Sequence, residues 1–211
     1  MFTGIVAAVG QIQSIEPFAG DKANTGVHIK IHAGGLDLAD VGLGDSIAIQ
    51  GACMTVVSKH ADGFSVDVSR ESLRLTMGLD ALGPVNLEKS LRIGDQIGGH
   101  FVSGHDDGLG EVVKFEAVGE SWELVVQAPA ALAAFLAYKG SITVNGVSLT
   151  VNRVEDVAGG TRFSINLIPH TIAVTTLQYL KSGQRVNLEV DTIARYVERM
   201  LSTAQGGSRS L

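Results

Sequence analysis

The amino-acid sequence predicts an all-β protein made of two similar small barrels, followed by one helix. Three observations support this prediction. Short segments of alternating apolar and polar residues are separated by glycine-containing turns. The second half of the chain repeats the first at a distance of about 100 residues. A stretch near the C-terminal end has the periodicity of an amphipathic helix and no counterpart in the first half.

The first half contains six alternating segments at a spacing that suits a small closed barrel, in which no strand is left as an unpaired edge. They are Gly10–Ile15, Val27–Ile31, Ser46–Gln50, Thr55–Ser58, Phe64–Val68 and Val85–Glu88. No alternation of strands with long helices is visible, which argues against a parallel α/β sheet. We expect short helical pieces at Gly35–Ala39 and Pro129–Ala137.

The repeat is visible in three blocks of the sequence. Met1–Gly10 aligns with Phe101–Gly110, Ser46–Val56 with Ser141–Val151, and Val85–Glu88 with Val186–Glu189. The offset varies only between 95 and 101 residues, so the insertions have the size of loops. We therefore expect an N-terminal barrel over residues 1–97, a second barrel over 98–189, and a helix with a tail over 190–211.

The helical pattern places six apolar residues on one face, with Arg195, Glu198 and Arg199 opposite. The apolar residues are Val190, Ile193, Ala194, Val197, Met200 and Leu201. This face could pack on its own barrel or against the same helix of other subunits. We favour self-association, because the helix is left over from both barrels.

Composition excludes several classes of protein. The 211 residues are 45% hydrophobic and 18% charged, as expected for a globular chain. The net charge of −6 leaves no basic surplus for nucleic acid. The single cysteine, Cys53, permits no intramolecular disulfide and suits a reducing compartment. Without a signal peptide or a long apolar run, the sequence predicts a cytoplasmic protein that does not enter a membrane.

Two copies of one motif dominate the chain, Gly51–Val57 (GACMTVV) and Gly146–Asn152 (GVSLTVN). Each follows an alternating segment, so each predicts a strand, a glycine-centred turn and a strand that carries a small reactive side chain two residues before a threonine. Two copies of one pocket-forming element suggest two copies of one ligand.

Comparison of the repeats separates shared from divergent positions. The pairs Gly4/Gly104, Gly51/Gly146 and Thr55/Thr150 are the same, as expected of residues that hold a common ligand. Five other pairs differ in reactivity: Cys53/Ser148, Ile5/His105, Glu71/His170, Gly44/Lys139 and Ser90/Asp191. Shared recognition with divergent chemistry fits a reaction in which two identical molecules have unequal roles, although drift could also produce the divergence. No phosphate-binding loop, dinucleotide motif, nucleophile elbow or zinc-binding pattern is present, so we expect no metal and no cofactor.

Several motifs taken together resemble the riboflavin synthase family. They are Met1–Val6 (MFTGIV), Gly51–Val56, Glu71–Arg74 (ESLR), Val85–Glu88 (VNLE), Ile97–His105 (IGGHFVSGH), Lys139–Ile142 (KGSI), Asn145–Val151 (NGVSLTV) and Leu167–Thr171 (LIPHT). The resemblance implies tandem six-stranded antiparallel barrels of the Greek-key, flavin-synthase type, assembled as a homotrimer through C-terminal helices. It also implies the final step of riboflavin biosynthesis. Two molecules of 6,7-dimethyl-8-ribityllumazine dismutate by transfer of a four-carbon unit, giving riboflavin and 5-amino-6-ribitylaminouracil.

The same resemblance implies the site residues. The substrate-binding residues of the first barrel are Gly4, Ile5, Val6, Ser46, Cys53, Met54, Thr55, Asp67, Val68, Ser69, Arg70, Glu71 and Ser72. Those of the second are Gly104, His105, Asp106, Lys139, Ser148, Leu149, Thr150, Asn166, Leu167, Ile168, Pro169, His170, Thr171 and Asp191. In the family one site pairs the first barrel of one subunit with the second barrel of its neighbour. Lumazine synthase is a further expected partner.

The reaction suggests roles for three of these residues and for Phe2. One lumazine must lose a proton from its C7 methyl group, and we assign that proton transfer to His105, whose imidazole titrates near neutral pH. Cys53 and Ser148 would activate the ring near C7, directly or through water. Phe2 would close the pocket. The alternative function is a lumazine or flavin carrier of the same superfamily, which would bind one chromophore without turnover.

Overall fold

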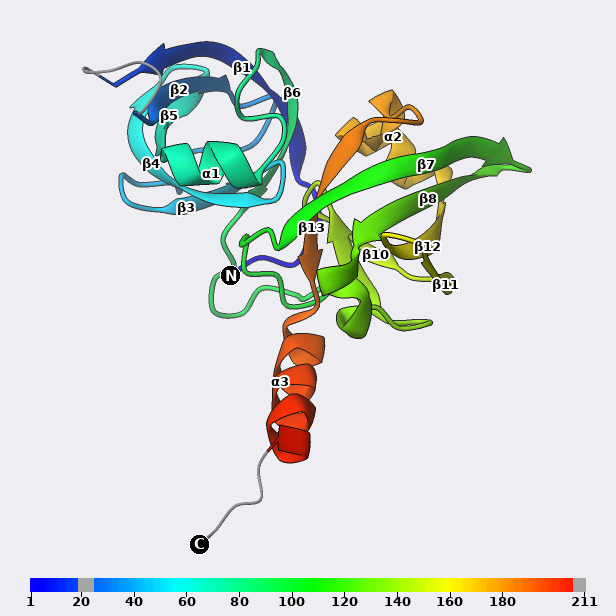
Figure 1. The fold of residues 1–211 in the computed structure, drawn as a ribbon. Helices are drawn as coiled ribbons and strands as arrows, with labels where there is room; N and C mark the ends of the chain where they lie inside the picture. Colours follow the sequence, from blue (N-terminus) through cyan, green and yellow to red (C-terminus); the bar gives the residue numbers. More distant parts are fainter. Residues whose placement is uncertain (19–24, 207–211) are drawn as a thin grey trace, which may run out of the picture.

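The computed structural model describes residues 1–18 and 25–206, in two β-rich halves joined by residues 90–107 (Figure 1). The predicted tail from residue 207 onward lies outside the described residues. The first half is a closed six-stranded antiparallel barrel in the order β1-β2-β5-β4-β3-β6. Its strands are β1 (Ala8–Pro17), β2 (Val27–His32), β3 (Ser46–Ile49), β4 (Ala52–His60), β5 (Gly63–Val68) and β6 (Gly83–Lys89). All six predicted segments are therefore strands.

The second half repeats this order as a seven-stranded sheet, β10-β9-β13-β7-β8-β12-β11. Its strands are β7 (Gly108–Val118), β8 (Ser121–Pro129), β9 (Ser141–Val144), β10 (Val147–Thr150), β11 (Arg153–Val157), β12 (Gly160–Leu167) and β13 (Arg185–Val190). β10 and β11 together correspond to β4, and they end up at opposite edges of the sheet. The break falls at Val151 and Asn152, where the Asn152 N–H donates to the Ser164 carbonyl at 2.8 Å. The all-β prediction is confirmed, with this strand divided.

Helices are few within the described residues, and all of them except α3 are short. α1 (Arg70–Leu75) follows β5 and α2 (Pro169–Val174) follows β12, at equivalent places in the two halves. Two 3-10 turns, η1 (Ala130–Phe135) and η2 (Thr176–Tyr179), lie in the second half. α3 (Thr192–Gly206) projects away from both barrels (Figure 1). None of the described helices has the length and apolarity needed to span a membrane.

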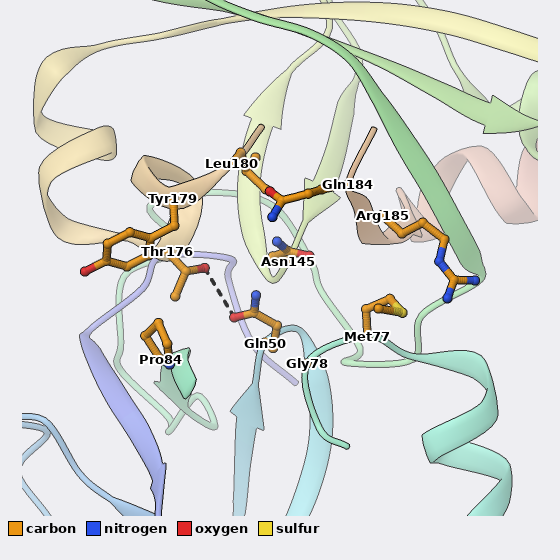
Figure 2. A pocket seen from close by; sticks show the side chains of 10 residues that line it. All are labelled: Gln50, Met77, Gly78, Pro84, Asn145, Thr176, Tyr179, Leu180, Gln184 and Arg185. Carbon is orange, nitrogen blue, oxygen red and sulfur yellow. Dashed lines mark hydrogen bonds between the residues drawn. The ribbon is translucent and has the colours of Figure 1, made fainter. Parts of the chain in front are cut away.

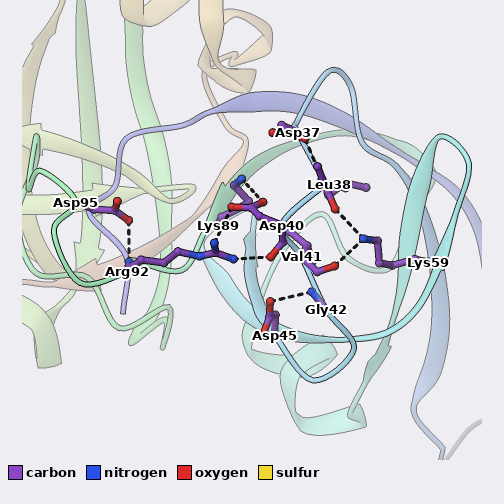
Figure 3. A network of polar contacts seen from close by, with 11 residues as sticks. Asp37, Leu38, Asp40, Val41, Gly42, Asp45, Lys59, Lys89, Arg92 and Asp95 are labelled. Atoms are coloured by element: carbon purple, nitrogen blue, oxygen red, sulfur yellow. Dashed lines mark hydrogen bonds and ion pairs between the residues drawn. The ribbon is translucent and has the colours of Figure 1, made fainter.

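The expected helical piece at 35–39 is wrong, because this stretch forms turns. Gly34 and Gly35 have positive φ angles of 60° and 98°, which end the preceding strand without starting a helix. A polar network then holds the loop open (Figure 3). The Lys59 ammonium donates to the carbonyls of Leu38 and Val41 at 2.7 and 2.6 Å, and the Val41 N–H donates to the Leu38 carbonyl at 3.2 Å, so the segment is held in turns.

Each half has its own apolar core inside the barrel. Ile12, Ile29, Ile31, Phe64 and Leu87 are among the buried side chains of the first core. The second core contains Val126, Phe163, Ile165, Val186 and Leu188 at equivalent positions. Along β2 and β4 the buried residues alternate with more exposed ones, so these strands have an inner apolar face and an outer face available for function.

The two repeated motifs form two tight hairpins that touch at their tips. Gln50 and Gly51 connect β3 to β4 with φ angles of 53° and 100°, and Asn145 and Gly146 connect β9 to β10 with 51° and 79°. Positive φ at both central residues is the pattern of a type I′ turn, which matches the strand twist. A Cβ at Gly51 would lie 2.9 Å from the Gly146 nitrogen, so the close approach of the turns requires glycine.

Candidate functional site

The reactive side chains of the repeated motifs lie on the outer faces of the barrels. In β4, Cys53 and Thr55 alternate with the buried Met54, and in β10, Ser148 and Thr150 alternate with the buried Leu149. On the neighbouring strands, Ser46 pairs with Thr55 and Ser141 pairs with Thr150. Each half thus presents the same row of small polar groups toward the outside, differing at the position of the nucleophile.

Four of the residues predicted to bind substrate point their side chains into the cores instead. Met54 and Val68 belong to the first core, and Leu149 and Leu167 belong to the second. A ligand on the outer face could reach these residues only through their backbone atoms.

The chain segments that cover these faces are exchanged between the halves. The Gly4 carbonyl accepts the N–H of Ser148 in the second half, and the Gly104 carbonyl accepts the N–H of Cys53 in the first half, both at 2.8 Å. A Cβ on either glycine would lie 2.6 Å from the Cβ of its neighbour, Ser148 or Cys53. The resemblance implied that Gly4 belongs with Cys53 and Gly104 with Ser148, whereas the structure pairs Gly4 with Ser148 and Gly104 with Cys53.

Two buried glutamates hold the exchanged segments in place. The Glu88 carboxylate accepts hydrogen bonds from the Thr3 N–H, the Thr3 hydroxyl and the Gly4 N–H at 2.7–3.0 Å. Glu189 accepts from the N–H groups of Ser103, Gly104 and His105 at 2.7–3.1 Å. Burial raises the pKa of both carboxyl groups, and these hydrogen bonds oppose the rise. The two glutamates occupy aligned positions of the repeats, and the sequence indicated no role for them.

A histidine that sequence analysis passed over lies next to one predicted nucleophile. His100 Nδ1 is 2.7 Å from the Ser148 hydroxyl oxygen, and its backbone N–H donates to the Thr3 carbonyl at 3.1 Å. Its Nε2 is buried and has no partner among the described residues. Burial lowers the pKa of His100, and the nearby Asp191 opposes this effect. The imidazole therefore favours the neutral form, which can accept the Ser148 hydroxyl proton at Nδ1.

The two predicted basic groups of the second site are exposed. His105 is held by its backbone N–H on Glu189, and its imidazole lies toward solvent. Lys139 has a φ of 64°, and its ammonium donates to the Asn152 side chain at 3.1 Å. Both can therefore reach a ligand on the outer face.

Phe2 and Asp191 have positions that the sequence did not indicate. Phe2 is fully buried against Ala48, Val102 and Cys53, so it packs beneath Cys53 and does not form a flap over a pocket. Asp191 accepts the Ile193 N–H at 2.8 Å at the start of α3. It acts on His100 through its charge.

The predicted segments after β5 and β12 lie at equivalent places beside the hairpins, since β5 pairs with β4 and β12 contacts β10. Ser69 caps α1 by accepting the Ser72 N–H at 3.0 Å, and Ile168 precedes Pro169 at the start of α2. The remaining members, Asp67, Arg70, Glu71, Asn166, His170 and Thr171, are exposed or partly exposed along these segments. Glu71 forms an ion pair with Arg74, and Asp67 with His28.

Asp106 has the least expected environment. Both carboxylate oxygens are buried without a hydrogen-bond partner in the described part of the chain, close to the Gly51 turn. Burial raises its pKa to about 8, with further contributions from the negative charges of Glu189 and Asp107. The exposed Ile5 and the half-buried Val6 occupy the equivalent positions of His105 and Asp106 in the first repeat. Across residues 1–18 and 25–206 no group of histidines, cysteine and carboxylates is placed to hold a metal ion.

Comparisons with known proteins agree with this arrangement. A model of the lumazine binding domain family matches residues 3–90 and again 103–191. A riboflavin synthase of Photobacterium phosphoreum is 42% identical over 95% of this chain and 89% of its own length. One of Mycobacterium tuberculosis is 43% identical over 97% of this chain and its full length. One of Bacillus subtilis is 39% identical over 97% and 91%.

Solved structures of LumP have the same fold. The complex with 6,7-dimethyl-8-(1'-D-ribityl) lumazine has a TM-score of 0.76 and 23% identity, over 90% of this chain and 99% of LumP. The complex with riboflavin has a TM-score of 0.76 and 25% identity over the same shares.

Proposed function

The chain belongs to the riboflavin synthase family and is an enzyme of the transferase type, and from this premise we propose how its residues divide the work. The reaction is the dismutation of two 6,7-dimethyl-8-ribityllumazine molecules to riboflavin and 5-amino-6-ribitylaminouracil. One molecule donates a four-carbon unit and the other accepts it. The observation that supports separate donor and acceptor sites is the pair of equivalent outer faces on β4 and β10. Each face carries a threonine, but the nucleophile is a cysteine on one and a serine on the other.

Each face would hold one ribityllumazine. Thr55 and Thr150 would bind the heterocycle in the same way on both faces, since each lies opposite a serine on the neighbouring strand. The segments after β5 and β12 would complete the two sites. Because Gly104 lies beside Cys53 and Gly4 beside Ser148, each ligand would contact both halves of the chain.

The two faces differ in how their nucleophiles are supported. The His100 imidazole lies at hydrogen-bond distance from the Ser148 hydroxyl. The neutral imidazole can therefore take the proton of that hydroxyl when the Ser148 oxygen adds at C7, or the proton of a water that adds there instead. Cys53 depends less on a neighbouring base, because a thiol is intrinsically more nucleophilic than a hydroxyl. His105, exposed at the rim of the Cys53 face, would take the proton of the C7 methyl group. Bringing the two rings together would supply much of the acceleration by proximity.

We further propose that neighbouring chains complete the site in a homotrimer. The support is the exposed apolar face of α3, where Ile193, Tyr196, Val197, Met200 and Leu201 are 49–71% exposed. Contiguous exposure of this kind is typical of an interface. The first barrel of one chain would then face the second barrel of the next. A cytoplasmic location stays a prediction from the sequence composition, and an association with lumazine synthase stays a prediction from the resemblance.

Incubation with 6,7-dimethyl-8-ribityllumazine tests this function. We expect riboflavin absorbance to appear, with one riboflavin formed for every two substrate molecules consumed. A carrier would bind the substrate, seen as a change in its fluorescence, without forming riboflavin, and that result would refute the proposal. Ser182→Ala, which removes a hydroxyl on an exposed turn outside both faces, serves as a control and should turn over normally.

A further inference from the structure

A cavity of about 370 Å³ lies where the two halves meet (Figure 2). Its size falls within the range of small-molecule sites. None of the residues that line it belongs to the predicted substrate-binding set. They are Gln50, Met77, Gly78, Pro84, Asn145, Thr176, Tyr179, Leu180, Gln184 and Arg185.

Three side-chain amides in this cavity already use their oxygen atoms within the protein. The Gln50 oxygen accepts the Asn86 N–H at 3.0 Å, and the Asn145 oxygen accepts the Asn187 N–H at 2.9 Å. The Gln184 oxygen accepts the Lys181 N–H at 2.8 Å. A backbone N–H can only donate, so each contact identifies the oxygen of the amide and fixes its orientation.

The NH₂ groups of the same amides therefore remain as donors. None of the three has an acceptor within residues 1–18 and 25–206. Figure 2 shows the amides of Gln50, Asn145 and Gln184 grouped together, with Tyr179 on one side and Arg185 on the other. Arg185 forms no ion pair with the carboxylates of the described residues, and no aspartate or glutamate lines the cavity. The site offers donors and a positive charge, and lacks a compensating anion.

This donor set selects for the chemistry of its ligand. An oxyanion has several acceptor oxygens and a negative charge, so it can satisfy amide NH₂ groups and a guanidinium together. Met77, Pro84, Leu180 and the Tyr179 ring add an apolar wall against which the rest of a small molecule could pack. We propose that this cavity binds the oxyanion group, carboxylate or phosphate, of a small molecule.

The position of the cavity has a consequence for stability. Gln50 belongs to the hairpin of the first half and Asn145 to that of the second, so an oxyanion between them would contact both halves. A ligand that binds only this folded arrangement raises the free energy of unfolding by RT ln(1 + L/Kd), where L is the free ligand concentration, so the unfolding temperature increases with the ligand concentration.

Calorimetric titration of the full-length protein with inorganic phosphate, and separately with malonate, tests the proposal at constant ionic strength. We expect saturable binding of at least one of the two, and the arm that binds identifies the oxyanion. Gln184→Glu keeps the oxygen that accepts from Lys181 and adds a negative charge, so it should weaken binding about tenfold or more. Arg185→Gln, which removes the positive charge of an exposed side chain, should also weaken binding.

Gln127→Glu is the matched control, since it makes the same isosteric change on β8 outside the cavity, and it should bind like the unmodified protein. Absence of saturable binding of both probes would overturn the proposal. So would equal affinity in Gln184→Glu and Gln127→Glu, because binding would then lie elsewhere. These measurements do not depend on turnover, so their result is independent of the proposed reaction.

Discussion

Asp106 shows how one side chain couples the junction of the halves to pH. Its carboxylate is buried near the touching hairpins, and this burial, together with the negative charges of Glu189 and Asp107, raises its pKa to about 8. In the unfolded chain an aspartate titrates near its ordinary value of 3.8. Between these two values the unfolded state releases the proton and the folded state keeps it. The free energy of unfolding therefore falls as pH rises through this window.

We predict that Asp106→Val raises the free energy of unfolding much more at pH 7–8 than near pH 4. Valine occupies the equivalent position, Val6, in the first repeat, where it packs against the second core. The gain at high pH should be on the order of several kcal/mol, since each pKa unit corresponds to about 1.4 kcal/mol. Urea unfolding across this pH range measures it. Parallel pH profiles for the variant and the unmodified protein would contradict the assignment.

His100 and His105 can be separated by their contacts. His100 is half-buried beside Ser148. His105 is exposed and follows Gly104, the residue that lies beside Cys53. We predict that His100→Gln and His105→Gln each lower kcat, by about 100-fold for loss of a general base, with little change in stability. Steady-state kinetics with ribityllumazine measure this effect, and circular dichroism confirms folding. If His105→Gln turned over normally, proton transfer by His105 would be refuted and His100 would remain as the base.

At the scale of single elements, α3 is attached at its first turn and free beyond it. Arg195 forms two hydrogen bonds with the Asp107 carboxylate at 2.7 and 2.8 Å, which fixes the helix to the second half. Further along, α3 contacts η1, and a groove of about 540 Å³ lies between its apolar face and Ala134, Phe135 and Ala137. A helix held so firmly at one end, with so little packing of its own, is suited to pack against other chains.

We predict that Val197→Glu reduces the oligomer to monomers, because a charge would be buried in the contact between helices. Light scattering coupled to size exclusion would measure the mass. Glu198→Gln, on the next residue, is the control and should leave the oligomer unchanged. A monomeric unmodified protein would end the trimer proposal, whereas retention of the oligomer in Val197→Glu would move the interface away from α3.

For the whole molecule, two asparagines join the halves in a reciprocal way. Asn86 of the first half donates to the Asn145 carbonyl of the second, and Asn187 of the second donates to the Gln50 carbonyl of the first, both at 2.9 Å. Asn187 also accepts the Met77 N–H at 2.6 Å and donates to the Met77 carbonyl at 3.0 Å. Together with the exchanged segments, these bonds should make the halves unfold as one unit.

We predict that Asn187→Ala lowers the free energy of unfolding by about 2–4 kcal/mol, because it leaves buried backbone groups of Gln50 and Met77 without partners. Chemical unfolding followed by the Trp122 fluorescence of the second half and by overall circular dichroism would measure it. Asn166→Ala, on an exposed side chain, should change it by less than about 0.5 kcal/mol. Separate transitions by the two probes in the unmodified protein would show that the halves unfold independently.

The sequence by itself determined the strands, the duplication and the reactive residues. These features depend on local patterns: strand alternation repeats every two residues, and the motifs around Cys53 and Ser148 recur with similar spacing. It also indicated the amphipathic helix, because its periodicity is local. The helix expected at 35–39 is wrong, because Gly34 and Gly35 have positive φ and the carbonyls of Leu38 and Val41 bind Lys59, which is distant in sequence.

Only the tertiary structure decided how the two halves exchange their segments. Comparison of repeats aligns Gly4 with Gly104 but cannot show that each lies beside the nucleophile of the other half. The same holds for the buried carboxylate of Asp106, for the contact of His100 with Ser148 and for the donor-lined cavity between Gln50 and Asn145. These features arise from contacts between residues 48 or more positions apart, such as His100 and Ser148, whose energies depend on burial and geometry in three dimensions.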